Sequence, residues 1–162
     1  MATKNDFTAE EWQLLTLAPV NAGSYIVTAD LTVIGAIREM KALGKALEDP
    51  TPPAAAQELV AAIIADAEVQ AKNKEENETA PAPAKEGEDV REPIRQALQQ
   101  TAVLLDAKCT PEEAAGFKQW LRDVAQAVAE ADKEGSHFGI GGQRVSDKEQ
   151  TALAELTTLF NL

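Results

Sequence analysis

The chain has 162 residues, a hydrophobic content of 44%, only 4% aromatic residues and a formal net charge of −12. This length suits one domain, and small aliphatic side chains must fill its core, which favours packed helices over sheet. The acidic balance argues against non-specific binding to nucleic acid or anionic membranes, because such binding needs a basic surface.

A cytoplasmic location is expected for this chain. The single cysteine, Cys109, excludes an intramolecular disulfide, which fits a reducing compartment. The N-terminal sequence MATKNDFTAEEW lacks the basic region and apolar run of a secretory signal.

The first predicted helix begins at the capping box Thr8-Ala-Glu-Glu11, in which a hydroxyl and a carboxylate each accept a backbone amide. Phe7 and Trp12 stand at the two positions of a hydrophobic staple. We expect this helix over residues 9–17, and Pro19 either ends it or opens a second helix that continues through residue 29.

Residues 14–37 carry a single charge, Asp30. Their Leu, Val and Ile side chains favour membrane insertion by roughly 3–6 kcal/mol, and Asp30 opposes it by about 3 kcal/mol. Interspersed proline, glycine and polar residues weaken the case further, so we expect a buried helical segment and no membrane span. Asp30 is predicted to cap the next helix, whose inward face would comprise Ile34, Ile37, Met40 and Leu47.

Three prolines at 50, 52 and 53 interrupt the chain, and Thr51 between them is a predicted cap for a helix over 54–74. The apolar residues of that helix follow the 3.6-residue period: Ala56, Leu59, Val60, Ile63, Ile64 and Ala67. Residues 75–89, EENETAPAPAKEGED, are acidic and rich in proline, and they predict a flexible loop between helices of one bundle.

Capping-box patterns open three further helices, at Asp89-Val-Arg-Glu92, Thr110-Pro-Glu-Glu113 and Ser146-Asp-Lys-Glu149. Their expected inward residues are Ile94, Leu98, Thr101 and Leu105, then Phe117, Trp120, Leu121, Val124, Val128 and Ala131, then Leu153, Leu156, Leu159 and Phe160. The face opposite the middle set carries Lys118, Arg122, Asp123 and Glu130. These elements predict an all-α, single-domain bundle of six or seven helices over residues 1–162.

No catalytic residue, metal site or cofactor is predicted. One histidine, His137, and one cysteine cannot make a four-ligand zinc site unless carboxylates complete it. Asp132, Glu134 and His137 lie close together in sequence, but a helix end followed by a polar loop explains them better. Cys109 precedes a helix N-terminus, which can lower a thiol pKa; packing as a small hydrophobic side chain is the stronger interpretation.

Residues 135–149, GSHFGIGGQRVSDKE, hold four of the nine glycines. The segment lacks the preceding strand and the Lys-Ser/Thr ending of nucleotide-binding loops. The candidate ligand contacts are Gly141, Gly142, Arg144 and Ser146. An anion would bind there to the free amides of the helix that Ser146 opens. The alternative is a structural crossing between two helices. Asp30, a carboxylate in an apolar setting, is the remaining candidate ligand contact.

The C-terminal pattern resembles a group of uncharacterised bacterial all-helical proteins with a Phe-Gly-x-Gly-Gly-x-Arg-Val-Ser loop. The matching residues are Gly135, Phe138, Gly139, Gly141, Gly142, Arg144, Val145 and Ser146. The Thr8-Ala-Glu-Glu-Trp12 start followed by Ala18-Pro19 is similar to the same group. The resemblance covers both ends of the chain, skips its acidic middle and implies no catalytic residue.

The leading functional hypothesis is a non-enzymatic structural or interaction protein that self-associates, as a homodimer, or binds another protein. The alternative is a helical domain that binds a small ligand. A hydrophobic ligand would occupy a pocket between residues 14–37 and the helix over 117–131, and an anionic ligand would bind at the glycine-rich loop. A third hypothesis is an enzyme that uses Glu10, Glu11, Asp30 or Asp132. Glu10 and Glu11 are also explained as first-turn acids that complement the helix dipole.

Overall fold

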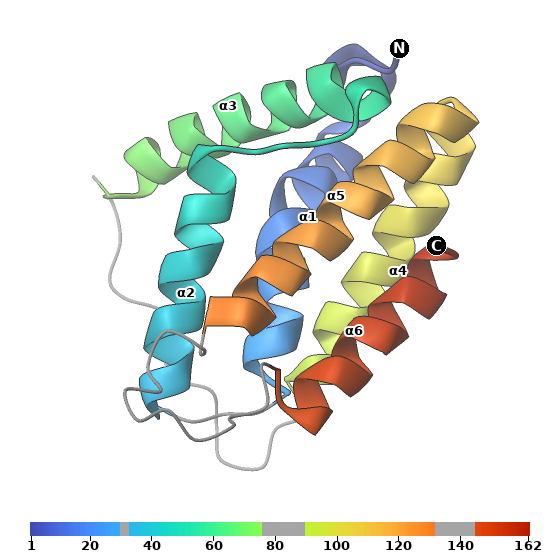
Figure 1. Ribbon diagram of the computed structural model, residues 1–162. Coiled ribbons are helices and arrows are strands. Elements are labelled where there is room, and N and C mark those ends of the chain that lie inside the picture. The colour runs from blue at the N-terminus through green and yellow to red at the C-terminus, as the bar shows by residue number, and fades with distance from the viewer. Residues whose placement is uncertain (30–32, 76–89, 132–144) are drawn as a thin grey trace.

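The computed structural model describes residues 1–29, 33–75, 90–131 and 145–162 (Figure 1). Over these residues the chain forms helices and no strand, which confirms the predicted all-α bundle. The α-helices are α1 (Ala9–Val27), α2 (Val33–Glu48), α3 (Gln57–Glu75), α4 (Arg91–Lys108), α5 (Pro111–Glu130) and α6 (Asp147–Phe160). Short 3-10 turns, η1 (Lys4–Asp6) and η2 (Ala54–Ala56), precede α1 and α3. Most of the predicted acidic loop, residues 76–89, lies outside the described residues.

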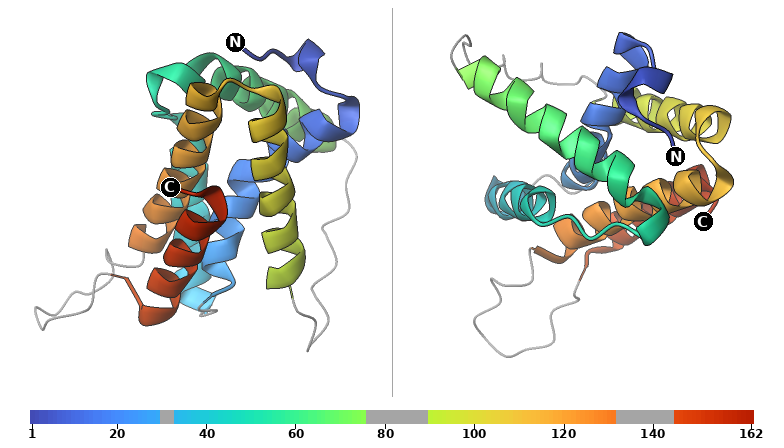
Figure 2. Two further views of the ribbon diagram at one scale, coloured as in Figure 1. Left: turned by 90° about the vertical axis from the view of Figure 1, so that its right-hand side faces the viewer. Right: turned by 90° about the horizontal axis from the view of Figure 1, so that it is seen from above.

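Helix α1 is the centre of the bundle, since it packs against every other described α-helix. The other helices lie around it, and α3 crosses over one end of the bundle (Figures 1 and 2). The largest buried side chains come from α1, α3, α4, α5 and α6, and include Leu15, Ile26, Ile63, Leu98, Phe117, Trp120 and Phe160. One shared core therefore holds the two halves of the chain together.

The predicted helix starts at Thr8, Thr110 and Ser146 are confirmed. In each, the hydroxyl oxygen accepts the amide of the residue three positions on, at 3.2–3.3 Å, and the glutamate at that position accepts the cap amide. The staple is also present, with the Phe7 and Trp12 ring centroids 5.8 Å apart. The expected box at residues 89–92 is only partly visible: α4 begins after Val90, and Asp89 lies outside the described residues.

The prediction that Pro19 ends a helix or opens a new one is wrong, because α1 runs through it without a break. A proline inside a helix removes one backbone hydrogen bond and costs about 3 kcal/mol. Buried residues continue on both sides of Pro19, from Leu15 and Ala18 to Ala22 and Ile26. Their packing against the surrounding helices offsets the loss, so tertiary contacts decide the length of α1.

Two expectations about the α2–α3 region are wrong. Met40 was expected to face inward but is 50% exposed, because Glu39 and Leu43, four residues apart, occupy the inward face and Met40 is turned about 100° away. Thr51 caps no helix: η2 begins after Pro53, without a side-chain cap, and α3 follows it. Ala56 in η2 is fully buried where α5 approaches closely at Gly116, so packing sets this helix start.

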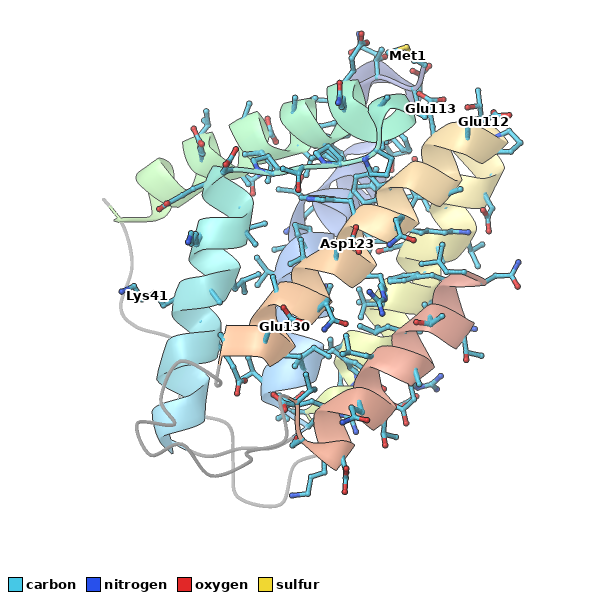
Figure 3. All side chains as sticks on the ribbon, viewed as in Figure 1. Met1, Lys41, Glu112, Glu113, Asp123 and Glu130 are labelled. Carbon is cyan, nitrogen blue, oxygen red and sulfur yellow. The ribbon has the colours of Figure 1, made fainter. Side chains whose placement is uncertain are left out.

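Lys118 was expected on the solvent face of α5, and that expectation is wrong. Its side chain is only 7% exposed, and Nζ donates to Oδ1 of Asp106 on α4 at 2.6 Å. The aliphatic stem of a lysine packs well against a neighbouring helix while its charged end reaches a carboxylate. Asp123 and Glu130 do face outward from α5 (Figure 3).

The structure also bears on the apolar segment 14–37. Among the described residues, no helix combines the length and the apolar character that crossing a membrane requires.

Candidate functional site

An open groove of about 670 Å³ lies between α4 and α6, which run side by side in the same direction (Figure 1). Its floor is Tyr25 near the end of α1, and its polar walls are Arg95 and Gln99 of α4 and Thr151, Glu155 and Thr158 of α6. Ala154 and Leu159 add apolar surface. The volume falls within the range of small-molecule sites in proteins.

Helical spacing places the two walls. Arg95 and Gln99 are four residues apart, so they lie one above the other on α4. On α6, Thr151 and Glu155 are four residues apart and Glu155 and Thr158 are three apart, so the three share one face over two turns. The core residue Leu98, one position before Gln99, is fully buried. Arg95 and Gln99 therefore lie beside the core, at the edge of α4 that borders α6.

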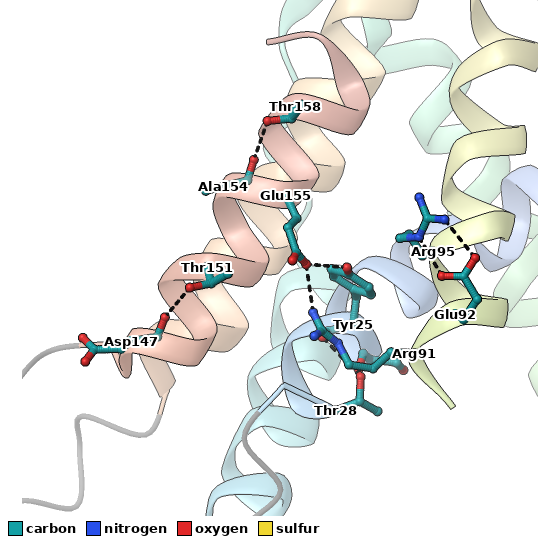
Figure 4. Close-up of polar contacts among 11 residues, drawn as sticks. Tyr25, Thr28, Arg91, Glu92, Arg95, Asp147, Thr151, Ala154, Glu155 and Thr158 are labelled. Atoms are coloured by element: carbon teal, nitrogen blue, oxygen red, sulfur yellow. Dashed lines mark hydrogen bonds and ion pairs between the residues drawn. The ribbon is translucent and has the colours of Figure 1, made fainter. Parts of the chain in front are cut away.

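A polar cluster joins three helices at the floor of the groove. The Tyr25 hydroxyl donates to Oε2 of Glu155 at 2.6 Å, and the Arg91 guanidinium donates to the same oxygen at 3.1 Å (Figure 4). The Arg91 guanidinium carbon also lies 4.3 Å from the centre of the Tyr25 ring, within the range of a cation–π contact. The cluster therefore fixes the orientation of Glu155 from two sides.

On the opposite wall, Arg95 forms a two-pronged ion pair within α4. Nε and Nη2 each donate to a carboxylate oxygen of Glu92 at 2.8 Å. The hydrogen bonds from Arg95, followed by one from Gln96, lower the pKa of Glu92 to about 2. The pair holds the guanidinium in place while its Nη1 makes no hydrogen bond within the described part of the chain.

The two threonine hydroxyls on the α6 wall donate their protons to backbone carbonyls of the same helix. Thr151 donates to the Asp147 carbonyl at 2.8 Å, and Thr158 donates to the Ala154 carbonyl at 3.0 Å (Figure 4). A hydroxyl that donates to the backbone keeps its oxygen lone pairs. The α6 wall consequently presents hydrogen-bond acceptors to the groove.

Of the sequence-predicted ligand contacts, only Ser146 lies among the described residues, and it does not line this groove. Its hydroxyl oxygen accepts the Glu149 amide as the cap of α6. Asp30, Gly141, Gly142 and Arg144 lie outside the described residues, so their role as ligand contacts stays a prediction. The same holds for Asp132 as a catalytic carboxylate, for the metal-site candidates Glu134 and His137, and for Gly135 as the end of a helix.

The other carboxylates considered for catalysis have structural partners or are open to solvent. Glu11 completes the α1 capping box and pairs with Nζ of Lys108 at 2.6 Å, while Glu10 is exposed. Within the described ranges, no three side chains of the metal-ligating types gather at one point. The groove residues were missed because the sequence does not reveal which helices are neighbours.

The titration of Tyr25 gives a direct check on the floor of the groove. Burial, followed by the hydrogen bond to Glu155, raises the pKa of the phenol from 10.0 to about 12. A raised pKa means that these contacts stabilise the fold fully below pH 10 and are lost as the pH rises through about 12. Tyr25 is the only tyrosine, so absorbance at 295 nm reports it alone, and we expect its midpoint near pH 12 in the folded protein.

The Glu155→Gln variant should lower that midpoint but leave it above 10, because the carboxylate charge is removed while burial remains. Glu58→Gln on α3 is the control and should titrate as the wild type does. A midpoint near 10 in protein that retains its helical circular dichroism would contradict the described environment.

Cys109 is predicted to react slowly. Burial, followed by the nearby charge of Glu113, raises the pKa of its thiol from 9.0 to about 11. The thiolate fraction at neutral pH then falls about 100-fold, and the thiolate is the reactive form. A less acidic thiolate is more nucleophilic, which offsets part of this loss, so Ellman's reagent at pH 7.5 should modify the native protein at least about tenfold more slowly than the same protein in urea. Equal rates in the two solutions would rule out this burial.

Comparison of the chain with protein-family models, curated proteins and solved structures found no match. The resemblance to bacterial helical proteins therefore stays a prediction, and functional inference rests on the groove itself.

Proposed function

We propose that the protein is a non-enzymatic ligand-binding helical domain, with its binding site in the groove between α4 and α6. The single observation that carries the proposal is the groove of about 670 Å³, in which Arg95, Gln99 and Glu155 each keep polar atoms without a hydrogen bond in the described part of the chain. The charged side chains of Arg95 and Glu155 and the apolar surface of Ala154 and Leu159 together favour a ligand that has both a charged group and an aliphatic part.

The titratable groups support binding over acid–base catalysis. A general acid or base works best with a pKa near the operating pH. Hydrogen bonds from Lys108, followed by the Thr8 amide, lower the pKa of Glu11, and burial raises the pKa of Tyr25 and of Cys109. Each of these shifts moves a group further from neutrality and stabilises its resting protonation state.

Native mass spectrometry of the purified protein tests the proposal. We expect a bound species whose mass increment disappears in Ala154→Phe, because the larger side chain fills the groove. Ala62→Phe is the matched control, since Ala62 is also an exposed helical alanine but lies on α3, away from the groove. An increment that survives Ala154→Phe would place the ligand elsewhere, and its absence from wild-type protein would count against the function.

Self-association as a homodimer is the second candidate function. Leu17 and Val20, three residues apart on the central helix α1, are 45% and 38% exposed, and exposed apolar residues on one helix face favour a protein contact. Analytical ultracentrifugation should show a dimer that Leu17→Lys converts to monomer, while Val103→Lys on α4 does not. A strict monomer at high concentration would contradict it.

We also propose a cytoplasmic location and a bacterial origin for the protein. The single cysteine supports the first, and the resemblance of both chain ends to bacterial helical proteins supports the second.

A further inference from the structure

The two walls of the groove carry hydrogen-bonding groups of different kinds. On the α4 wall, Nη1 of Arg95 is a charged donor, and the Gln99 amide has no partner in the described part of the chain. On the α6 wall, the hydroxyl oxygens of Thr151 and Thr158 and Oε1 of Glu155 are acceptors. Figure 4 shows Arg95 and Glu155 on opposite sides, with Tyr25 between them.

The internal contacts fix this separation. Glu92 accepts hydrogen bonds from two nitrogens of Arg95, so Nη1 remains as a donor for a ligand. Tyr25 and Arg91 both bind Oε2 of Glu155, which leaves Oε1. Because both charged groups are held by neighbours, a ligand that joins them loses little side-chain freedom on binding, and such preorganisation favours affinity.

We propose that the groove binds an amphoteric ligand of the amino-acid type, with its carboxylate toward Arg95 and its ammonium group toward Glu155 and the threonine oxygens. A carboxylate only accepts hydrogen bonds and an ammonium group only donates them, so each end matches one wall. Glu92 already offsets the charge of Arg95, and Arg91 offsets that of Glu155. The ligand's two ends therefore match the two walls through charge-assisted hydrogen bonds to Nη1 and Oε1. This inference rests on the proposed ligand-binding function.

Two kinds of molecule carry both an ammonium group and a carboxylate in this way: a free amino acid and a short peptide with free ends. The groove volume of about 670 Å³ accommodates either. The apolar surface of Ala154 and Leu159 lies within the same groove, which suits a side chain with aliphatic carbons. The probes are therefore L-leucine, the dipeptide leucyl-leucine, N-acetyl-L-leucine, which lacks the ammonium group, and L-leucinamide, which lacks the carboxylate.

Binding is measured on the full chain by amide chemical-shift titration at neutral pH. We expect L-leucine or leucyl-leucine to shift the resonances of Gln99 and Thr158, with the tighter of the two identifying the source. Blocking either end should weaken binding by about tenfold or more, as expected for a lost charge-assisted hydrogen bond.

Two variants test the contacts to the two ends of the ligand separately. Arg95→Gln should weaken L-leucine and N-acetyl-L-leucine and leave L-leucinamide unchanged, and Arg122→Gln on α5 is its control. Thr158→Val should weaken L-leucine and L-leucinamide and leave N-acetyl-L-leucine unchanged. Thr157→Val is the matched control, because Thr157 makes the same kind of bond, to the Leu153 carbonyl at 2.9 Å, but does not line the groove.

Four outcomes decide the inference. The end-specific pattern supports it. If the blocked probes bind as tightly as L-leucine, the amphoteric class is wrong and the binding groove stands. The third outcome is that no probe shifts a groove resonance while native mass spectrometry shows a bound species that Ala154→Phe removes. In that case the amphoteric ligand class is wrong, but the proposed ligand-binding function stands. If neither experiment detects a ligand in the groove, the inference and the proposed function fail together.

Discussion

Replacing Trp120 by alanine should lower the free energy of unfolding by about 3–5 kcal/mol, the usual cost of removing a large aromatic side chain from a core. Trp120 is 2% exposed, and its ring meets that of Phe117 edge to face, with centroids 5.3 Å apart. The substitution therefore removes buried apolar surface and leaves a cavity between α5 and the helices that pack against it. Urea unfolding followed by circular dichroism measures the change.

Val103→Ala on α4 is the control for this variant. Val103 is 64% exposed, and its truncation should change stability by no more than about 0.5 kcal/mol. A loss below about 1 kcal/mol for Trp120→Ala would contradict the described core, because the site would then have to be loosely packed or open to water.

Glycine-to-alanine changes at Gly23 and Gly44 should have opposite effects. A Cβ at Gly44 meets nothing within 4 Å, so Gly44→Ala should stabilise α2 by about 1 kcal/mol through helix propensity. A Cβ at Gly23 lies 2.8 Å from Cδ1 of Leu43, which is itself buried. The resulting overpacking costs about 1–3 kcal/mol and offsets the gain in propensity.

The double variant Gly23→Ala/Leu43→Ala isolates this contact. Removing the Leu43 side chain should make Gly23→Ala stabilising by up to about 1 kcal/mol, so the two substitutions should couple by about 1–3 kcal/mol. Additive effects in thermal and urea unfolding would contradict the close approach of α1 and α2.

Local chemistry explains which features could be predicted from the sequence. The helix starts at Thr8, Thr110 and Ser146 depend on side chains within three residues, so the pattern alone predicts them. The inward stripe of α5 was also predicted, because a regular period of apolar residues defines a face. Each of these features is complete within one helix.

Features that depend on neighbouring helices could not be predicted. Pro19 continues a helix because packing on both sides offsets its cost, and Lys118 is buried because Asp106 of α4 stands beside it. The groove has the same origin: Tyr25, Arg95 and Glu155 come from three helices, and no spacing in the sequence indicates that they meet. The expected pocket was placed between residues 14–37 and α5; the groove that the structure describes borders α6 instead.

The central position of α1 also bears on how the chain folds during its synthesis. α1 is made before α5, its principal partner, and the last turn of α5 leaves the ribosome roughly 100 residues later, which takes roughly 5–20 s. Until α4 is made, in the later part of that interval, the apolar face of α1 has only α2 and α3 to cover it. Contacts between segments so distant in sequence slow folding, so the bundle should complete its core only after most of the chain is made, with the uncovered α1 a natural target for chaperones.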